Sequence, residues 1–191
     1  VVHAGKMWVV GGDANQGHYQ NDVWSTEDGR DWERVSNSVP WAPRALHYTV
    51  VHDGYIWVVG GQTIPQFALE SESFYNDAWR SRDGVVWECV SADLPMPQRG
   101  MIGGSAVFRD QMWVLGGGTY DTPNIPDRKF YNDVWSSFDG ASWECHTTFA
   151  PWHARQYHEV AVWDNQLWVL EGYHSDSGNR NDVWYSDGIV W

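Results

Sequence analysis

Three arginines recur in register and have the chemistry to bind an anionic or sugar-like ligand. Arg44, Arg99 and Arg155 are spaced 55 and 56 residues apart, and two of them follow a tryptophan by three positions, Trp41 and Trp152. A guanidinium group donates paired hydrogen bonds to a carboxylate, and an aromatic face stacks on apolar surfaces. We therefore predict a binding role for these five residues. A scaffold role is the alternative, because a repeated arginine can also satisfy backbone carbonyls of an adjacent unit.

Residues that interrupt the repeat form a second set of candidates. Glu171 stands where the other units have glycine. A carboxylate near an arginine can act as a general acid or base, so Glu171 with Arg155 is the catalytic alternative. Aromatic and imidazole side chains follow Glu171 or occupy the loops of variable length, and we predict binding roles for Phe67, Tyr120, Tyr173 and His174.

Other registered polar residues are interpreted as scaffold. His47 and His158 follow two of the arginines by three positions and are expected to bridge the first strand to the backbone of the next unit. One aspartate in each unit is expected to cap the turn into a strand through its own backbone, at Asp22, Asp77, Asp133 and Asp182.

The elements that position these residues are repeated units. The string Asn-Asp-x-Trp occurs four times, and twelve of the fifteen tryptophans fall into three series that recur once per unit. Aromatic residues at a fixed period indicate packing between units. Each unit is predicted to form four short strands, A to D in chain order. In the second unit, strand A covers 47–51, strand B contains Trp57, strand C starts at Asn76 and strand D contains Trp87.

The turns and loops fall on two faces. Asp-Gly pairs join strand A to B in the second unit and strand C to D in all four units. This is the strongest short hairpin signal, because both turn residues must reach positive φ. The B-to-C tryptophan spacing is 16 residues in the outer units and 22 in the middle two, while the remainder of the repeat hardly varies. Variation is therefore confined to one side, the long-loop face, and we expect this face to bind. The opposite side is the tight-turn face.

These motifs resemble the kelch family of β-propellers. The resemblance rests on an apolar strand ending in Gly-Gly, a tryptophan about twenty residues later and another after a turn, repeated at about fifty residues. It implies an all-β propeller of four-stranded antiparallel blades, roughly 1–36, 44–91, 99–147 and 155–191, in a single domain over 1–191. The Ser-x-Asp-Gly-x-x-Trp turns also look like a shortened Asp-box of sialidase-type propellers. Glu171 departs from the Gly-Gly pattern.

The number of units predicts an incomplete ring. Propellers run from four to eight blades, and kelch propellers commonly close at six or seven. We expect a partial propeller within a longer natural chain, with pairing of two copies and a small four-bladed ring as alternatives. Open blade edges favour self-association.

Composition excludes some classes of binding partner. A net charge of −13 with only twelve basic residues argues against nucleic acid, and no apolar run is long enough for membrane insertion. Cys89 and Cys145 occupy equivalent places in successive units and are expected to be free thiols, which leaves the compartment undecided. No motif indicates a metal or another cofactor.

The leading hypothesis is a non-catalytic module that binds a protein or glycan on the long-loop face. The alternative is a mutarotase-like enzyme acting on sugars or sialate.

Overall fold

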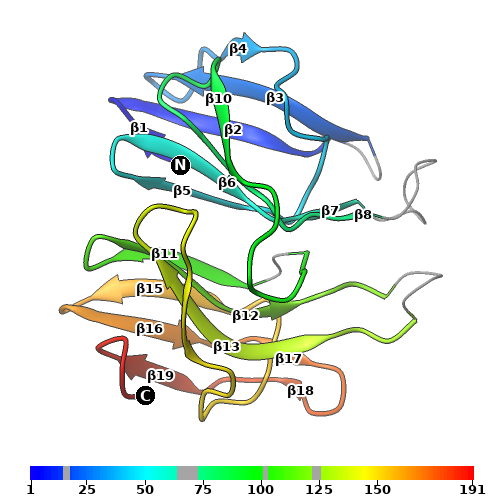
Figure 1. Ribbon diagram of the computed structural model, residues 1–191, viewed down its shortest axis with the longest axis vertical. Coiled ribbons are helices and arrows are strands. Elements are labelled where there is room, and N and C mark those ends of the chain that lie inside the picture. The colour runs from blue at the N-terminus through cyan, green and yellow to red at the C-terminus, as the bar shows by residue number, and fades with distance from the viewer. Residues whose placement is uncertain (15–17, 64–72, 101–102, 122–125) are drawn as a thin grey trace.

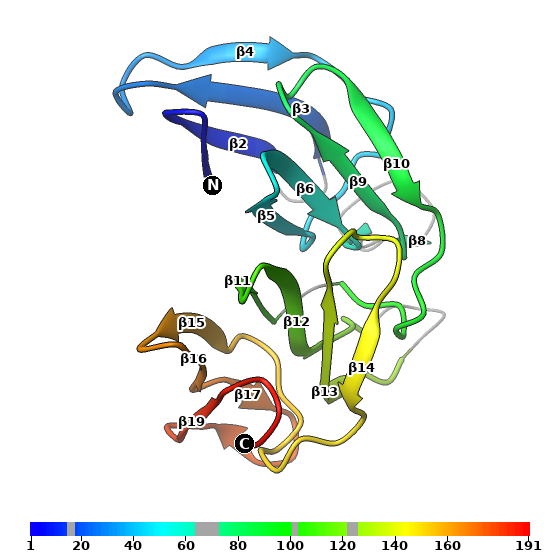
Figure 2. The same ribbon diagram turned by 60° about the vertical axis from the view of Figure 1, so that its left-hand side comes forward.

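The computed structural model describes residues 1–14, 18–63, 73–100, 103–121 and 126–191 (Figure 1). Within these ranges the chain is all β, in four main antiparallel sheets that form the blades of a four-bladed β-propeller, which confirms the predicted fold class. Figure 2 shows the four sheets following one another in an arc around a common axis. The described part of the chain has no helix that could cross a membrane.

The first two blades each have the four predicted strands in meander order. Blade 1 consists of β1 (Val2–His3), β2 (Lys6–Asp13), β3 (Tyr19–Thr26) and β4 (Glu33–Ser36). Blade 2 consists of β5 (Tyr48–His52), β6 (Tyr55–Val59), β9 (Ala78–Ser81) and β10 (Trp87–Ser91). A two-stranded hairpin, β7 (Gln62–Thr63) with β8 (Ser73–Phe74), extends blade 2 between its second and third strands.

Blade 3 repeats this plan and blade 4 has three strands. Blade 3 consists of β11 (Gly104–Phe108), β12 (Gln111–Gly118), β13 (Phe130–Ser137) and β14 (Glu144–Thr147). Blade 4 consists of β15 (Glu159–Trp163), β16 (Gln166–Leu170) and β19 (Val183–Ser186). The hairpin of β17 (Tyr173–His174) and β18 (Gly178–Asn179) extends blade 4 as β7 and β8 extend blade 2.

The turns confirm one prediction and correct another. Asp53 and Gly54 have φ angles of 48° and 70°, as the Asp-Gly signal predicts. In the C-to-D turns only the glycine has positive φ, so the same prediction is wrong there. The aspartate carboxylate instead accepts backbone N–H groups two and three residues ahead: Asp83 accepts them from Val85 and Val86, both at 2.9 Å. These turns are therefore fastened by the aspartate side chain, which explains why they need only one left-handed residue.

Successive blades interlock at a repeated contact, which we call the inter-blade joint. The tryptophan of the second strand in one blade lies against the glycine of the C-to-D turn in the next. At the first joint, a Cβ on Gly84 would lie 2.6 Å from Cζ3 of Trp8. The second and third joints repeat this contact, in the pairs Trp57 with Gly140 and Trp113 with Gly188. Three apolar clusters fill the spaces between successive blades, so the core is divided among the joints.

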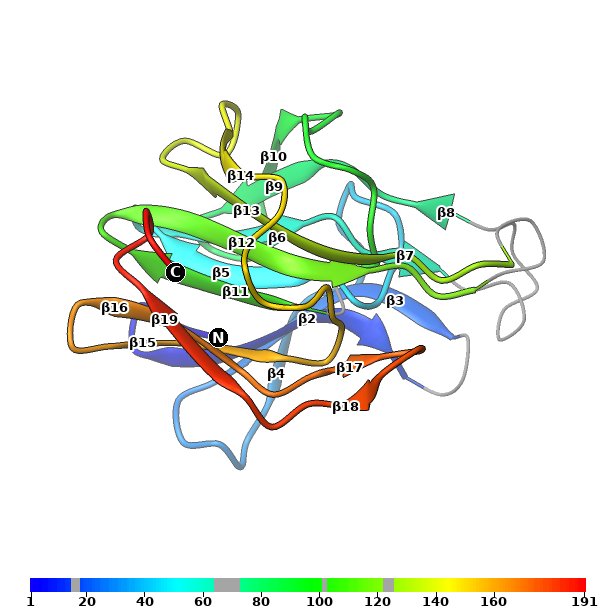
Figure 3. The same cartoon turned by 90° about the horizontal axis from the view of Figure 1, so that it is seen from below.

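The two faces are arranged as predicted. The β7–β8 and β17–β18 hairpins project on one side, and the turns between the first and second strands of the blades lie on the other (Figures 1 and 3). The described strands β7 and β8 of the second unit's variable loop therefore share the long-loop face with the candidate site residues after β16.

Candidate functional site

The registered arginines are buried scaffold residues. Arg99 is 0 % exposed, and its Nη1 and Nη2 donate to the two carboxylate oxygens of Asp133 at 2.7 and 2.6 Å. Nη1 also donates to the carbonyl of Gly116 at 2.7 Å. Arg44 and Arg155 bind Asp77 and Asp182 in the same way, and both are buried. The predicted ligand-binding role of these three arginines is corrected, because each guanidinium group is already engaged within its own blade.

The Asn-Asp-x-Trp string fastens two connections at once. In blade 3, Asn132 Nδ2 donates to the carbonyls of Ala150 and Trp152 on the chain leaving the blade. Asp133 holds Arg99 on the chain entering the blade, and it also accepts Trp135 Nε1 at 2.8 Å. The principal partners of this aspartate are thus an arginine and an indole, rather than the backbone of its own turn as predicted.

Trp41 and Trp152 are also scaffold residues. Each is 1 % exposed and lies over the arginine three positions on, with the guanidinium carbon 5.8 Å from the ring centroid. The prediction that these tryptophans present an open stacking surface is corrected, because the apolar clusters between blades cover them.

The two registered histidines join successive blades. His47 Nε2 bonds the carbonyl of Val10 at 2.9 Å, and His158 Nε2 bonds that of Leu115 at 2.8 Å. These histidines therefore bridge neighbouring units, but both partners belong to the preceding blade and not to the next one as predicted. Burial lowers the pKa of each ring to about 4, which keeps both rings neutral at pH 7.

An aromatic strip lies on the long-loop face of blades 3 and 4. Its members contact one another in sequence, and they are Tyr120, Tyr157, Tyr173, Phe130, His174 and His153. The ring centroids of Tyr157 and Tyr173 are 6.4 Å apart, and those of Phe130 and His174 are 4.3 Å apart. Tyr157 is 48 % exposed. The structure thus brings together three of the predicted binding residues, Tyr120, Tyr173 and His174; Phe67 lies outside the described residues.

A cavity of about 410 Å³ opens beside this strip. Its lining consists of Tyr157, Glu171, Gly172, Tyr173 and Asn179. Two tyrosine rings, a carboxylate and a carboxamide therefore converge on one space, which combines aromatic surface with hydrogen-bond donors and acceptors.

Two of the residues that line this cavity have left-handed backbone conformations. Tyr157 has φ 57° and Glu171 has φ 59°, values that cost a residue with a Cβ about 1 kcal/mol. Leu46 has the same conformation at the position equivalent to Tyr157, so this part of the strain belongs to the repeat. Glu171 is different, because glycine occupies its place in the other units.

The equivalent position in blade 3 shows what a side chain would meet there. At the equivalent Gly116, a Cβ would lie 3.1 Å from Trp152 Cη2 and 2.9 Å from the carbonyl oxygen of Tyr131. Trp152 belongs to the chain that leads to the next blade. Glu171 itself is exposed and lines the cavity.

Two rings of the strip have shifted pKa values, and an arginine lies over a third. Burial, followed by the hydrogen bond with the Tyr120 hydroxyl, raises the pKa of Tyr157 to about 12. Partial burial and the nearby His153 lower the pKa of His174. Arg128 lies over Tyr120 with its guanidinium carbon 4.5 Å from the ring centroid, and it binds Asp121 at 2.7 Å. These shifts favour the neutral forms of Tyr157 and His174 at neutral pH, and Arg128 is paired with Asp121 beside Tyr120.

No protein-family model matches the chain, and no curated protein matches it. The assignment of the site consequently depends on its geometry and chemistry. Within the described ranges, no group of three or more His, Cys, Asp or Glu is placed to hold a metal ion. Cys89 and Cys145 are free and exposed on β10 and β14.

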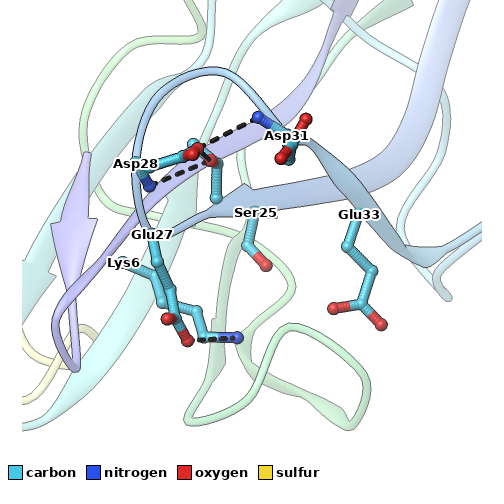
Figure 4. Close-up of a pocket in the computed structure, with 7 residues that line it drawn as sticks. Lys6, Ser25, Glu27, Asp28, Asp31 and Glu33 are labelled. Atoms are coloured by element: carbon cyan, nitrogen blue, oxygen red, sulfur yellow. Dashed lines mark hydrogen bonds and ion pairs between the residues drawn. The ribbon is translucent and has the colours of Figure 1, made fainter.

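A second cavity, of about 320 Å³, lies at the C-to-D turn of blade 1 (Figure 4). It is rich in carboxylates, but two of them are already bound by backbone N–H groups or by the lysine of the cavity itself. Asp28 accepts the N–H groups of Arg30 and Asp31 at 2.8 and 3.0 Å, and Lys6 lies 3.5 Å from Glu27. This cavity contains no aromatic ring among its lining residues, and its central carboxylate is committed to folding the turn.

Sequence reasoning missed Tyr157, Phe130 and Asn179. Tyr157 lies between Arg155 and His158, in a segment interpreted as scaffold, so its outward position was not apparent. Its left-handed backbone, φ 57°, is a conformation that the sequence of a tyrosine does not indicate. Phe130 and Asn179 belong to the ends of β13 and β18, whose proximity follows from the packing of blades 3 and 4.

Proposed function

We propose that this chain is a non-catalytic binding module of the kelch type, whose long-loop face binds a glycan at the aromatic strip and its cavity. The observation that carries the proposal is the convergence of Tyr157, Tyr173, Glu171 and Asn179 on one open cavity. Aromatic faces pack against the C–H faces of sugar rings, while carboxylate, amide and phenol groups match sugar hydroxyls.

The size and charge of the site agree with a neutral sugar. A volume of about 410 Å³ lies within the range of small-ligand sites, roughly 300 to 1,000 Å³. Glu171 accepts hydrogen bonds from hydroxyl groups, but it repels a ligand carboxylate. The net charge of −13 disfavours an acidic glycan further. The left-handed backbone at Glu171 supports a functional role for this residue, because such strain concentrates at ligand sites.

The kelch assignment has separate support. The glycine pairs that end the second strands adopt positive φ in three blades, and the tryptophans of the repeat form the inter-blade joints. These are the structural roles that the repeated motif requires. The blades we infer to be kelch-type are therefore a scaffold, and the ligand site lies on the loops that differ between them.

The enzymatic alternative receives less support. It requires a catalytic carboxylate beside an open arginine, and Glu171 is the only residue of that pair available for this purpose. Arg155 donates to both carboxylate oxygens of Asp182 and to the backbone carbonyl of Glu171. Acid–base chemistry on a sugar would thus rest on a single exposed carboxylate, so we assign binding rather than catalysis.

A glycan array probed with the labelled chain tests this proposal. We expect retention on neutral glycans, with at least tenfold weaker binding for Tyr157→Ala and a smaller loss for Glu171→Gln, measured by calorimetry with the strongest ligand. Val86→Ala, an exposed site in a turn on the tight-turn face, is the matched control and should bind like the parent. Absence of any retained glycan, or unchanged affinity in Tyr157→Ala, would refute the assignment. Proton NMR of anomeric exchange in the same ligand detects catalysis if it occurs.

A further inference from the structure

The cavity beside the aromatic strip contains a carboxylate that lacks a counter-ion. The described residues that line it include one carboxylate, that of Glu171, and no lysine, arginine or histidine. Glu171 is exposed, and none of the ion pairs formed within the described ranges involves its side chain. A cationic group of a ligand therefore meets a negative charge in this cavity that no neighbouring residue has balanced.

Arg155 contacts Glu171 without neutralising it. Its Nη1 donates to the backbone carbonyl of Glu171 at 2.6 Å. The same Nη1 and Nη2 donate to the two carboxylate oxygens of Asp182, at 2.6 and 2.8 Å. Asp182 is thus the counter-ion of Arg155, and the side chain of Glu171 is left for a ligand.

Two tyrosine rings line the cavity together with this carboxylate. The centroids of Tyr157 and Tyr173 are 6.4 Å apart, and their planes are inclined at 56°. The face of an aromatic ring attracts a cation that lies within about 6 Å of its centroid. Burial, followed by the hydrogen bond with Tyr120, raises the pKa of Tyr157 to about 12, so this ring is a neutral phenol at neutral pH. Two aromatic rings and one carboxylate therefore favour positive charge in the same space.

The residue type at position 171 points in the same direction. Its φ of 59° is a conformation that glycine adopts freely and that asparagine adopts more readily than most other residues. Asparagine at this place would offer sugar hydroxyls a neutral acceptor at a lower conformational cost. Glu171 supplies a negative charge in addition, and the net charge of −13 attracts cations to the whole chain.

Asn179 distinguishes between two kinds of cation. Its side-chain carbonyl and the carboxylate of Glu171 are hydrogen-bond acceptors at one cavity. A primary ammonium group has three N–H donors for such acceptors, whereas a quaternary ammonium group has none. The lining therefore suits a primary ammonium better than a quaternary one.

We infer that the preferred ligand is a glycan with a protonated amino group, such as a hexosamine unit without its N-acetyl group. The inference depends on the proposed glycan-binding function and specifies the class of sugar. The ammonium group binds Glu171 and Asn179, while the C–H face of the sugar ring packs on a tyrosine. Neutral glycans use the same rings and bind more weakly. An exposed ion pair and a cation–π contact are each modest, and together they give a preference of about tenfold.

Calorimetry with a matched pair of ligands tests the inference. The probes are the linear trisaccharide of glucosamine and the same trisaccharide of N-acetylglucosamine, at a mildly acidic pH. We expect the glucosamine trisaccharide to bind about tenfold more tightly, and salt should reduce this advantage. Glu171→Gln should abolish the preference and change the affinity for the N-acetylated trisaccharide much less. Glu144→Gln removes the same charge from an exposed position on β14 and should keep the preference.

The possible failures are distinguishable. Equal affinity for the two trisaccharides overturns the inference and leaves glycan binding intact. A preference that survives in Glu171→Gln also overturns it, because the cation would then bind elsewhere. Equally tight binding of a trilysine peptide has the same meaning, since the sugar ring would contribute nothing. If neither trisaccharide binds while the glycan array retains other neutral glycans, the inference fails alone; an empty array refutes the proposed function and the inference with it.

Discussion

Replacing Asp133 by asparagine removes the counter-ion of a buried guanidinium group. Arg99 is fully buried and binds both carboxylate oxygens of Asp133 at 2.6 and 2.7 Å. Deletion of one partner from such a pair leaves an uncompensated charge in the interior, at a cost of about 3 to 5 kcal/mol. For a chain of this length the melting temperature should fall by about 6 to 20 °C.

The repeat provides an internal control for this variant. Asp22 occupies the equivalent place in blade 1 and accepts Trp24 Nε1 at 2.7 Å, but no arginine binds it in the described part of the chain. Asp22→Asn therefore replaces a charged acceptor by a neutral amide oxygen, which still accepts the indole N–H in a weaker hydrogen bond. We expect a destabilisation below 1 kcal/mol, because the acceptor is retained.

Urea unfolding followed by tryptophan fluorescence compares the two variants. The free energy of unfolding should fall by several times more in Asp133→Asn than in Asp22→Asn. Equal losses within about 1 kcal/mol would refute the reasoning, because the arginine would then contribute nothing beyond the motif common to both blades. A double variant, Arg99→Met with Asp133→Leu, should recover part of the loss, since an apolar pair leaves no buried charge.

Two further predictions concern buried histidines and left-handed positions. The pKa values of His47 and His158 are about 4 in the folded chain and about 6.5 when unfolded, so the unfolded state binds more protons below pH 6.5. Their contribution to stability is complete above pH 6.5 and is lost as the pH falls towards 4, by roughly 3 kcal/mol each. Urea titrations across this range should show the free energy of unfolding decreasing as the pH falls, and His47→Gln should make this decrease smaller. Gly116→Ala should lower the free energy of unfolding by about 1 to 3 kcal/mol, because its Cβ meets Trp152. Glu171→Gly should raise the free energy of unfolding by up to about 1 kcal/mol by releasing left-handed strain. Thermal melts in which Gly116→Ala is more stable than the parent chain and Glu171→Gly is less stable would contradict this account.

The repeated features of the fold were predictable from sequence. Four copies of Asn-Asp-x-Trp located the third strands, and Trp57 with its equivalents located the second strands, because a fixed period allows packing in only one register. The partner of Asp133 was less accessible. Arg99 lies 34 residues away, and only the packing of the entering chain against the third strand brings the two together.

The candidate site was predictable in part. Tyr120, Tyr173 and His174 were recognised because they depart from the repeat. Tyr157 was not, because its neighbours are scaffold residues and its exposure depends on a backbone angle that its residue type disfavours. Trp152 was wrongly predicted to bind a ligand for a related reason. An aromatic residue near a loop is expected at the surface, yet the packing of the next blade buries it.

The hydrogen bonds that Asn132 and Asp133 make to the chain entering and leaving the blade have a consequence for how the number of repeats changes in evolution. Both bonds are made inside one stretch that runs from the entering arginine to the departing tryptophan, about one repeat in length. A duplicated gene segment with those limits would carry both of these contacts with it, and it would have to match its neighbours through the tryptophan–glycine joint, the histidine bridge and the apolar cluster between blades. Recombination between copies can therefore lengthen or shorten the array in whole units, while the loops on one face diverge independently.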